Sequence, residues 1–146
     1  MNLFGMLEVS GSALAAERWR AEVVSANMAN AETTRTPQGG AYRRQLVVFR
    51  ALSAPRFPLL LAGLQSHHGP QQGVRVDRVV ADSTPQPQRY QPGHPDADAA
   101  GYVTYPNVNP VMEMTDLLSA VRAYQLNAAA VQAAKSMIQQ SLQILS

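Results

Sequence analysis

The C-terminal segment after Pro110 most constrains what this chain can fold into, because it contains no glycine and no further proline. Ala, Leu, Gln and Met are frequent in it, and all four favour the α-helix. We therefore predict one continuous helix over residues 110–146, about 50 Å long at roughly 1.5 Å per residue. Pro110 suits its first turn, where the missing N–H group needs no partner.

Apolar residues repeat along this segment with a period of seven, in two columns. The first column contains Met114, Val121, Ala128, Lys135 and Leu142. The second column contains Leu117, Tyr124, Val131, Ile138 and Leu145. Only Lys135 is polar, and the spacing alternates between three and four residues, as it does in coiled coils. Because such a stripe needs shelter from water, we predict that this helix packs against a partner helix.

A second amphipathic helix is predicted over residues 3–31. Apolar side chains recur on one of its faces, while most of its charged side chains lie elsewhere. That face contains Leu3, Leu7, Leu14, Ala21, Val24 and Met28. The two apolar stripes are natural complements, so we predict that the N- and C-terminal helices pack as a coiled-coil-like pair.

The middle of the chain has a different pattern and holds nine of the ten prolines. Residues 42–52 are rich in β-branched and aromatic side chains, and residues 73–81 alternate apolar with polar ones. Both patterns predict strands, and a third, short strand is predicted over residues 102–105. Residues 53–72 are predicted to form a loop, because they are rich in turn-forming residues.

These elements give a mainly α fold with a small β insertion, which belongs to the α+β class. We predict three parts: an N-terminal helix in residues 1–33, a β-rich insertion in residues 34–107, and a C-terminal helix in residues 108–146. The strands of the insertion are too few and too short to form a large core of their own.

Composition excludes several classes of protein. The formal net charge is only +2 and the twelve basic residues are scattered, so no basic stripe indicates nucleic-acid binding. Without cysteine the chain forms no disulfide and no cysteine-ligated metal site. No apolar run is long enough to insert into a membrane. Glu8 interrupts the N-terminal apolar stretch and no basic residue precedes Arg18, so we expect no cleaved signal peptide.

The sequence shows no constellation typical of catalysis or of cofactor binding, and we expect no catalytic residue, metal or cofactor. It lacks the nucleophile elbow and the glycine-rich phosphate loops. The histidines, at positions 67, 68 and 94, lack the spacing of a zinc site. Asp96 and Asp98 imitate the start of a calcium loop, but two later ligand positions hold Ala100 and Asn107, so a turn is favoured.

Some charged residues have simple interpretations. Glu113 and Asp116 lie near the start of the C-terminal helix, where negative charge complements the helix dipole. Arg43 and Arg44 lie on a predicted strand and are interpreted as a solvated pair, although a role in an interface stays open.

Four motifs stand out along the chain. They are SANMANA at residues 25–31, GHPDADAAGYV at 93–103, YPNVN at 105–109 with Glu113-Met114 after it, and RAYQLN at 122–127 with Lys135-Ser136-Met137 after it. These motifs resemble those of bacterial flagellar axial proteins and occur in the order typical of that family, and the loops in the second half of the middle segment are most similar to those of proximal-rod members. Leu126 departs from the family pattern, which has Ala at this position of R-x-Y-Q-A-N.

The resemblance implies a structural subunit, not an enzyme, that builds the proximal rod of the flagellar basal body. Rod, hook and filament subunits of this family form a tube from paired terminal helices. The implied partners are other copies of the chain, other rod proteins and the flagellar type III export apparatus. The implied location is the periplasmic rod, reached without a cleaved signal. The alternative is a soluble helical adaptor or export chaperone that binds a partner helix and stays in the cytoplasm.

The resemblance also implies which residues contribute to helix packing and assembly. Asn27 and Asn30 are implied to make polar contacts that fix helix register, whereas the residues alone equally allow two asparagines that end a helix. The matching motifs add Pro106, Asn107 and Asn127 as packing residues. The two apolar stripes predict Leu7, Leu14, Val24, Met28, Met114, Leu117, Val121, Tyr124, Val131, Ile138, Leu142 and Leu145 as packing residues.

Overall fold

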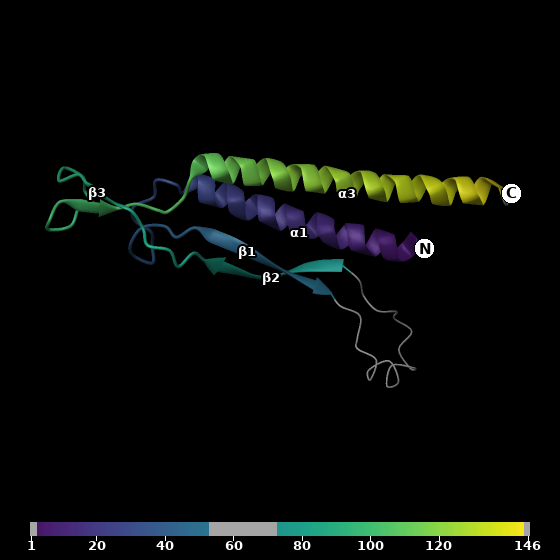
Figure 1. Cartoon of the computed structure of the whole chain (residues 1–146), viewed down its shortest axis with the longest axis horizontal. Coiled ribbons are helices and arrows are strands. Elements are labelled where there is room, and N and C mark those ends of the chain that lie inside the picture. The colour runs from purple at the N-terminus through teal and green to yellow at the C-terminus, as the bar shows by residue number, and fades with distance from the viewer. Residues whose placement is uncertain (1–2, 53–72, 145–146) are drawn as a thin grey trace, which may run out of the picture. The chain divides into compact units, whose positions relative to one another are not determined.

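The computed structural model describes residues 3–52 and 73–144 of the chain. The predicted loop at 53–72 and the predicted packing residue Leu145 therefore lie outside the described residues. A helix stands at each end of the described chain and short strands lie between them, so the predicted α+β class is confirmed. The elements are α1 (Leu3–Ala29), β1 (Gln45–Leu52), β2 (Gly73–Ala81), β3 (Gln88–Tyr90), β4 (Tyr102–Thr104) and α3 (Pro110–Ile144), shown in Figure 1.

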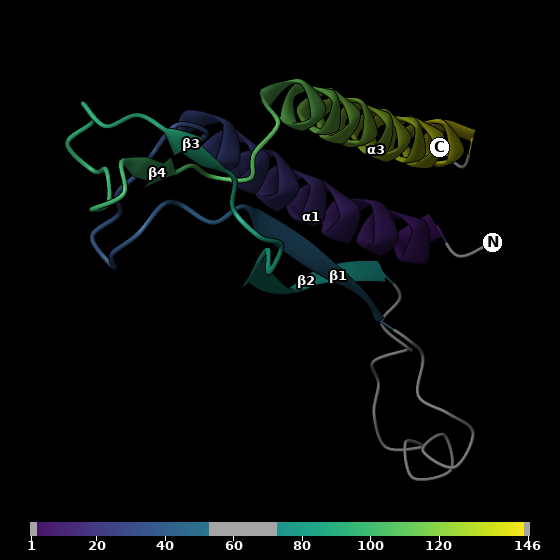
Figure 2. The same cartoon turned by 60° about the vertical axis from the view of Figure 1, so that its left-hand side comes forward.

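The chain divides into two compact units. The first unit comprises the described residues among 1–19, 49–77 and 120–146. The second unit comprises residues 20–48 and 78–119. Each unit therefore contains a part of both helices and a part of both β1 and β2. Figures 1 and 2 show that, within each unit, the part of α1 lies beside the part of α3.

The described strands form two small sheets. β1 and β2 make one of them and run in opposite directions (Figure 1). β3 and β4 make the other, which is antiparallel and pairs Gln88 with Thr104, Arg89 with Val103, and Tyr90 with Tyr102. β3 was not predicted from the sequence, because three residues are too few to show a period and their partner strand lies a loop away.

β1 begins at Gln45, three residues later than predicted. The difference has a local cause at Tyr42, whose backbone N–H donates to the carbonyl of Thr33 at 3.0 Å. The segment before Gln45 is thereby held in part by Thr33, just past the end of α1, and by side chains. β2 begins and ends at the predicted residues.

The ends of the two helices have recognisable caps. The Asn109 side chain accepts hydrogen bonds from the N–H groups of Val111, at 3.0 Å, and Met112, at 3.4 Å, so it caps α3 directly before Pro110. Past the last residue of α1, Asn30 donates its side-chain amide to the carbonyl of Ala26 at 2.9 Å and accepts from the Thr33 hydroxyl at 3.2 Å. These contacts agree with an asparagine that ends a helix, and the part of Asn30 in assembly stays a prediction.

Each buried position of α3 lies one residue before a position of the first predicted column. Glu113, Ala120 and Ala134 are buried and Asn127 is half-buried, which is again a repeat of seven. In the predicted columns, by contrast, four large side chains are exposed in the single chain, so their part in packing or assembly stays a prediction. The four are Met114, Val121, Tyr124 and Leu142. The coiled-coil-like pairing stays a prediction.

The physical reason is that the small side chains of α3 face inward. An alanine allows a neighbouring element to approach closely, and Glu113 is buried because it has polar partners, whereas hydrophobic periodicity gives most weight to large apolar residues. The other predicted packing residues are less exposed. Val24 is buried, and Leu7, Leu14, Met28, Leu117, Val131 and Ile138 are half-buried.

In the first unit, Ser12 joins α1 to the start of β2. Its hydroxyl donates to the carbonyl of Val9 at 2.7 Å and accepts from the N–H of Val74 at 3.1 Å. Gly73 precedes this contact with φ +147°, and a Cβ on it would collide with the Ser12 hydroxyl. Glycine is therefore required here both by the backbone angle and by the close approach.

We expect Gly73→Ala to lower the free energy of unfolding by about 1–3 kcal/mol, because alanine strains this backbone and displaces Ser12. Gly11→Ala is the matched comparison, since Gly11 lies in α1 with open space around its Cβ position. That substitution should raise stability by up to about 1 kcal/mol. Urea unfolding of both variants, followed by circular dichroism, measures the two values. Equal effects of the two substitutions would contradict this account.

Candidate functional site

A buried polar cluster in the second unit connects α1, α3 and the segment before β1. Asn27 of α1 lies at its centre and is 1% exposed. Its side-chain oxygen accepts from the backbone N–H of Gln45 at 2.9 Å and from the hydroxyl of Tyr42 at 3.0 Å. Its side-chain nitrogen donates to the carbonyl of Gln45 at 2.9 Å and to the carboxylate of Glu113 at 3.0 Å.

These four bonds use the whole hydrogen-bonding capacity of the Asn27 amide. By pairing with both backbone groups of Gln45, the amide takes the place that a neighbouring strand would have at the first residue of β1. A substituted side chain would have to satisfy three residues in two separate segments at once. Asn27 thus lies within α1 and links elements, so the alternative in which it merely ends a helix is wrong for this residue.

Glu113 lies in the first turn of α3 and is 1% exposed. One carboxylate oxygen accepts from the Nε of Arg44 at 2.6 Å, and the other accepts from Asn27. Burying a carboxylate is costly unless it is paired and hydrogen-bonded, and here both conditions hold. Removing Arg44 would leave this buried carboxylate without its counter-charge, and removing Asn27 would leave one of its oxygens without a donor.

A weaker ion pair extends this cluster toward the surface. Asp116, one turn after Glu113, lies 3.6 Å from Nη2 of Arg44 and 3.4 Å from Nη2 of Arg20. The Asp116 side chain is 41% exposed, so these contacts contribute little to stability. They nevertheless place the Arg44 guanidinium between two carboxylates of α3, which fixes its direction.

Tyr42 is held as a donor in this cluster. Burial, with a further contribution from the negative charge of Glu113, raises the pKa of its hydroxyl above 10.0. The hydroxyl therefore stays protonated at neutral pH and donates to Asn27. Because the folded-state pKa is the higher one, this stabilisation is complete below pH 10 and is lost as the pH rises through the folded-state value.

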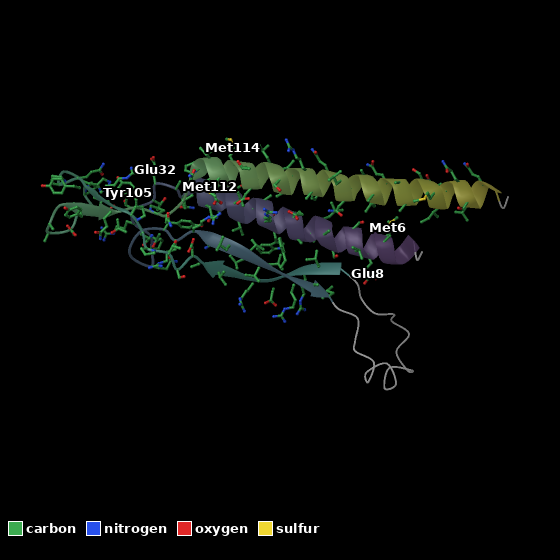
Figure 3. The ribbon with its side chains drawn as sticks, in the orientation of Figure 1. Met6, Glu8, Glu32, Tyr105, Met112 and Met114 are labelled. Atoms are coloured by element: carbon green, nitrogen blue, oxygen red, sulfur yellow. The ribbon has the colours of Figure 1, made fainter. Side chains whose placement is uncertain are left out.

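The loops beyond the helix ends of the second unit are also cross-linked. The Thr34 hydroxyl donates to the carboxylate of Asp96 at 2.7 Å, and Arg35 approaches the same carboxylate at 3.6 Å. Asp98 accepts from the N–H groups of Ala100 and Tyr102, which is a turn. The Arg89 guanidinium lies 4.7 Å from the ring centre of Tyr105, which Figure 3 labels.

The other residues predicted from the motifs lie outside the buried cluster. Pro106 is buried, and the Asn107 amide donates to the Thr84 hydroxyl at 2.9 Å. Asn127 donates to the carbonyl of Ala123 in its own helix at 2.9 Å. The structure therefore brings Asn27 alone among the predicted residues into the buried cluster.

Sequence reasoning missed three of the cluster's side chains, namely Tyr42, Arg44 and Glu113. Arg44 was interpreted as solvated, but it is mostly buried by its contacts with α3, while its neighbour Arg43 is exposed and bonds the carbonyl of Asp82 at 3.3 Å. Glu113 was interpreted as a partner of the helix dipole. The position of Glu113 near the start of a helix does not indicate that its ion-pair partner, Arg44, lies 69 residues away in the sequence.

Large apolar side chains on α3 are exposed in both units. A surface rich in such side chains is typical of a protein-interaction surface. In the second unit they are Val111, Met112, Met114 and Leu118, of which Figure 3 labels the two methionines near the start of α3. In the first unit they are Val121, Tyr124, Leu126, Met137 and Leu142.

The cluster has a structural role, because its side chains form hydrogen bonds and ion pairs with one another and so hold α1, α3 and the segment before β1 together. Among the residues that the structure describes, no group of three or more His, Cys, Asp or Glu is placed to hold a metal ion. Neither α1 nor α3, in its described part, is apolar enough over a sufficient length to cross a membrane.

Two protein-family models match the ends of the chain. Residues 7–35 match the family described as flagella basal body rod protein. Residues 99–144 match the family described as flagellar basal body rod FlgEFG protein C-terminal. Between them, the two matches cover Asn27 and Glu113, and leave Tyr42 and Arg44 outside.

Curated relatives are similar over nearly the whole chain. The flagellar basal-body rod protein FlgC of Borreliella burgdorferi is 42% identical, with 99% of each chain covered. The protein of that name from Bacillus subtilis is 38% identical, again with 99% of each chain covered. The one from Salmonella typhimurium is 39% identical, with 97% of each chain covered.

Proposed function

This chain belongs to the FlgC family of flagellar basal-body rod proteins, and we propose that it polymerises through its terminal helices into the proximal part of the rod. It is a structural subunit of that rod. The proposal concerns how the subunit joins its neighbours. The observation that carries it is the set of large apolar side chains left exposed on α3, between Val111 and Leu142.

A helix that stays exposed to water on this surface does not usually carry so many large apolar side chains. Removing them from water on assembly supplies a driving force of roughly 25 cal/mol for each Å² of apolar surface that becomes buried. Met114, Val121, Tyr124 and Leu142, which do not pack within the chain, are then contacts between subunits. The inward-facing alanines leave the outer face of α3 to carry the large residues.

Terminal segments 1–33 and 108–146 form the axial core in this proposal, and residues 34–107 form a β-rich insertion between them. The partners are other copies of the chain and other rod proteins. Export by the flagellar type III apparatus without a cleaved signal brings the subunit to the periplasm. The polar residues Asn30, Asn107 and Asn127 contribute local contacts that shape the interface.

The alternative, a helical adaptor or export chaperone, is not favoured, because full-length relatives are rod proteins. Its partner helix would bind the same exposed face of α3, but the protein would remain in the cytoplasm.

The experiment is complementation of a flagellate strain that lacks its own copy of the gene. We expect the tagged chain to restore swimming and to be found in purified basal bodies. A tagged chain that restores swimming but stays in the cytoplasmic fraction would refute the proposal in favour of the adaptor. A cytoplasmic reporter protein, measured in the same fractions, controls for contamination.

A further inference from the structure

The four residues 42–45 contact both terminal helices within the second unit, and we name them the strap. Tyr42 and Gln45 bond Asn27 of α1, and Arg44 bonds Glu113 and approaches Asp116 of α3. The Tyr42 side chain and the Gln45 backbone reach α1, and the Arg44 side chain reaches α3. A short stretch of chain thereby crosses from one helix to the other.

Most of the polar contacts in this cluster run through the strap. Two connect the helices directly, from Asn27 to Glu113 and from Arg20 to Asp116. Five connect the strap to a helix: three reach Asn27, one reaches Glu113 and one reaches Asp116. Without the strap, the carboxylate of Glu113 would be buried next to an amide but would have lost its cation.

The strap is also anchored on its other side. The carbonyl of Tyr42 accepts from the side-chain amide of Gln86 at 2.8 Å, and the carbonyl of Arg44 accepts from the N–H of Asp82 at 2.7 Å. A tight turn precedes it, in which Gly39 and Gly40 have φ of +89° and +73°. Both features hold the strap's backbone in position before its side chains bond.

We propose that the strap is a conformational device that closes over Asn27 and Glu113 and so couples the two helices of the free subunit. When it is closed, residues 20–29 of α1 and 110–119 of α3 are protected together. When it opens, both segments lose their protection together. The device concerns the single chain and does not rest on the proposed mode of polymerisation.

Native-state hydrogen exchange of the purified full-length chain tests the device. Arg44→Gln removes the cation of the strap, and Arg43→Gln is the matched control, because Arg43 is an exposed neighbour of the same type. We expect amides in 20–29 and 110–119 to exchange at least about tenfold faster in Arg44→Gln, since it leaves the buried carboxylate unpaired. Arg43→Gln should exchange like the parent.

Two further variants keep the test decisive if Arg44→Gln unfolds. Arg44→Lys retains the charge but loses the planar fork, so it should accelerate exchange less, again in both helix segments. Arg44→Gln combined with Glu113→Gln removes both charges and should exchange more slowly than Arg44→Gln alone.

Three results would overturn the proposal. The first is an Arg44→Gln chain that exchanges like Arg43→Gln. The second is acceleration confined to residues 41–46, which would show a strap that opens without releasing the helices. The third is a double variant that exchanges faster than Arg44→Gln, because closure would then not depend on the pairing of Glu113.

Discussion

Asn27→Leu is expected to lower the free energy of unfolding by about 3–5 kcal/mol, because each buried group left without a partner costs about 1–3 kcal/mol. Leucine fills nearly the same volume, so loss of packing is not the cause. The groups that lose a partner are one buried oxygen of Glu113 and three part-buried groups, namely the backbone N–H and carbonyl of Gln45 and the hydroxyl of Tyr42. Against a typical total of about 5–15 kcal/mol, this is a large fraction of the stability.

Asn30→Leu is the matched control, three residues further along the same chain. The Asn30 side chain bonds only local groups, Ala26 and Thr33, in the contacts that the structure describes for it. Its loss should cost about 1 kcal/mol, as for a helix cap. Urea unfolding followed at 222 nm compares the two variants. If Asn27→Leu were no less stable than Asn30→Leu, the central role of Asn27 would be wrong.

Leu118→Asp is expected to abolish incorporation into the rod while leaving the fold of the free chain unchanged. Leu118 lies on α3 and is 53% exposed, so a carboxylate there stays hydrated in the monomer and changes stability by less than about 0.5 kcal/mol. In an assembled rod the same carboxylate would be buried against a neighbour without a partner, which costs several times more. Cells with this variant should lack filaments and should not swim.

Ser119→Asp controls for charge, since Ser119 is an exposed, polar neighbour on the same helix. It should reduce swimming less than Leu118→Asp does. Circular dichroism of both purified variants checks the fold, and basal-body blots with motility agar check assembly. A Leu118→Asp strain that swims like its parent would show that this face of α3 is not a subunit interface. That outcome would leave the strap and its exchange test unaffected.

Local information was sufficient for the elements that depend on local chemistry. Pro110 and the absence of later glycine and proline predicted where α3 begins and that it continues without a break. The alternation of residues 73–81 predicted both ends of β2. Helix propensity, capping and strand alternation act over a few residues, so they are legible in a single sequence.

Which face of α3 turns inward could not be read in the same way. The heptad pattern favoured Met114 and Val121, whereas the chain buries Glu113 and Ala120 directly before them. Periodicity ranks positions by hydrophobicity, and it cannot distinguish a face that packs within the chain from one that is left for other subunits. Large side chains at an unfilled interface then look like core residues.

Short motifs and local propensities were enough to predict the two terminal helices, the β-rich middle and the family. Tertiary structure alone decided the strap, in which Arg44 meets a carboxylate 69 residues away and Asn27 pairs with the backbone of Gln45. A buried ion pair exists only where folding has removed water and brought both charges together. The spacing of residues along the chain reveals neither the removal of water nor the approach of the two charges.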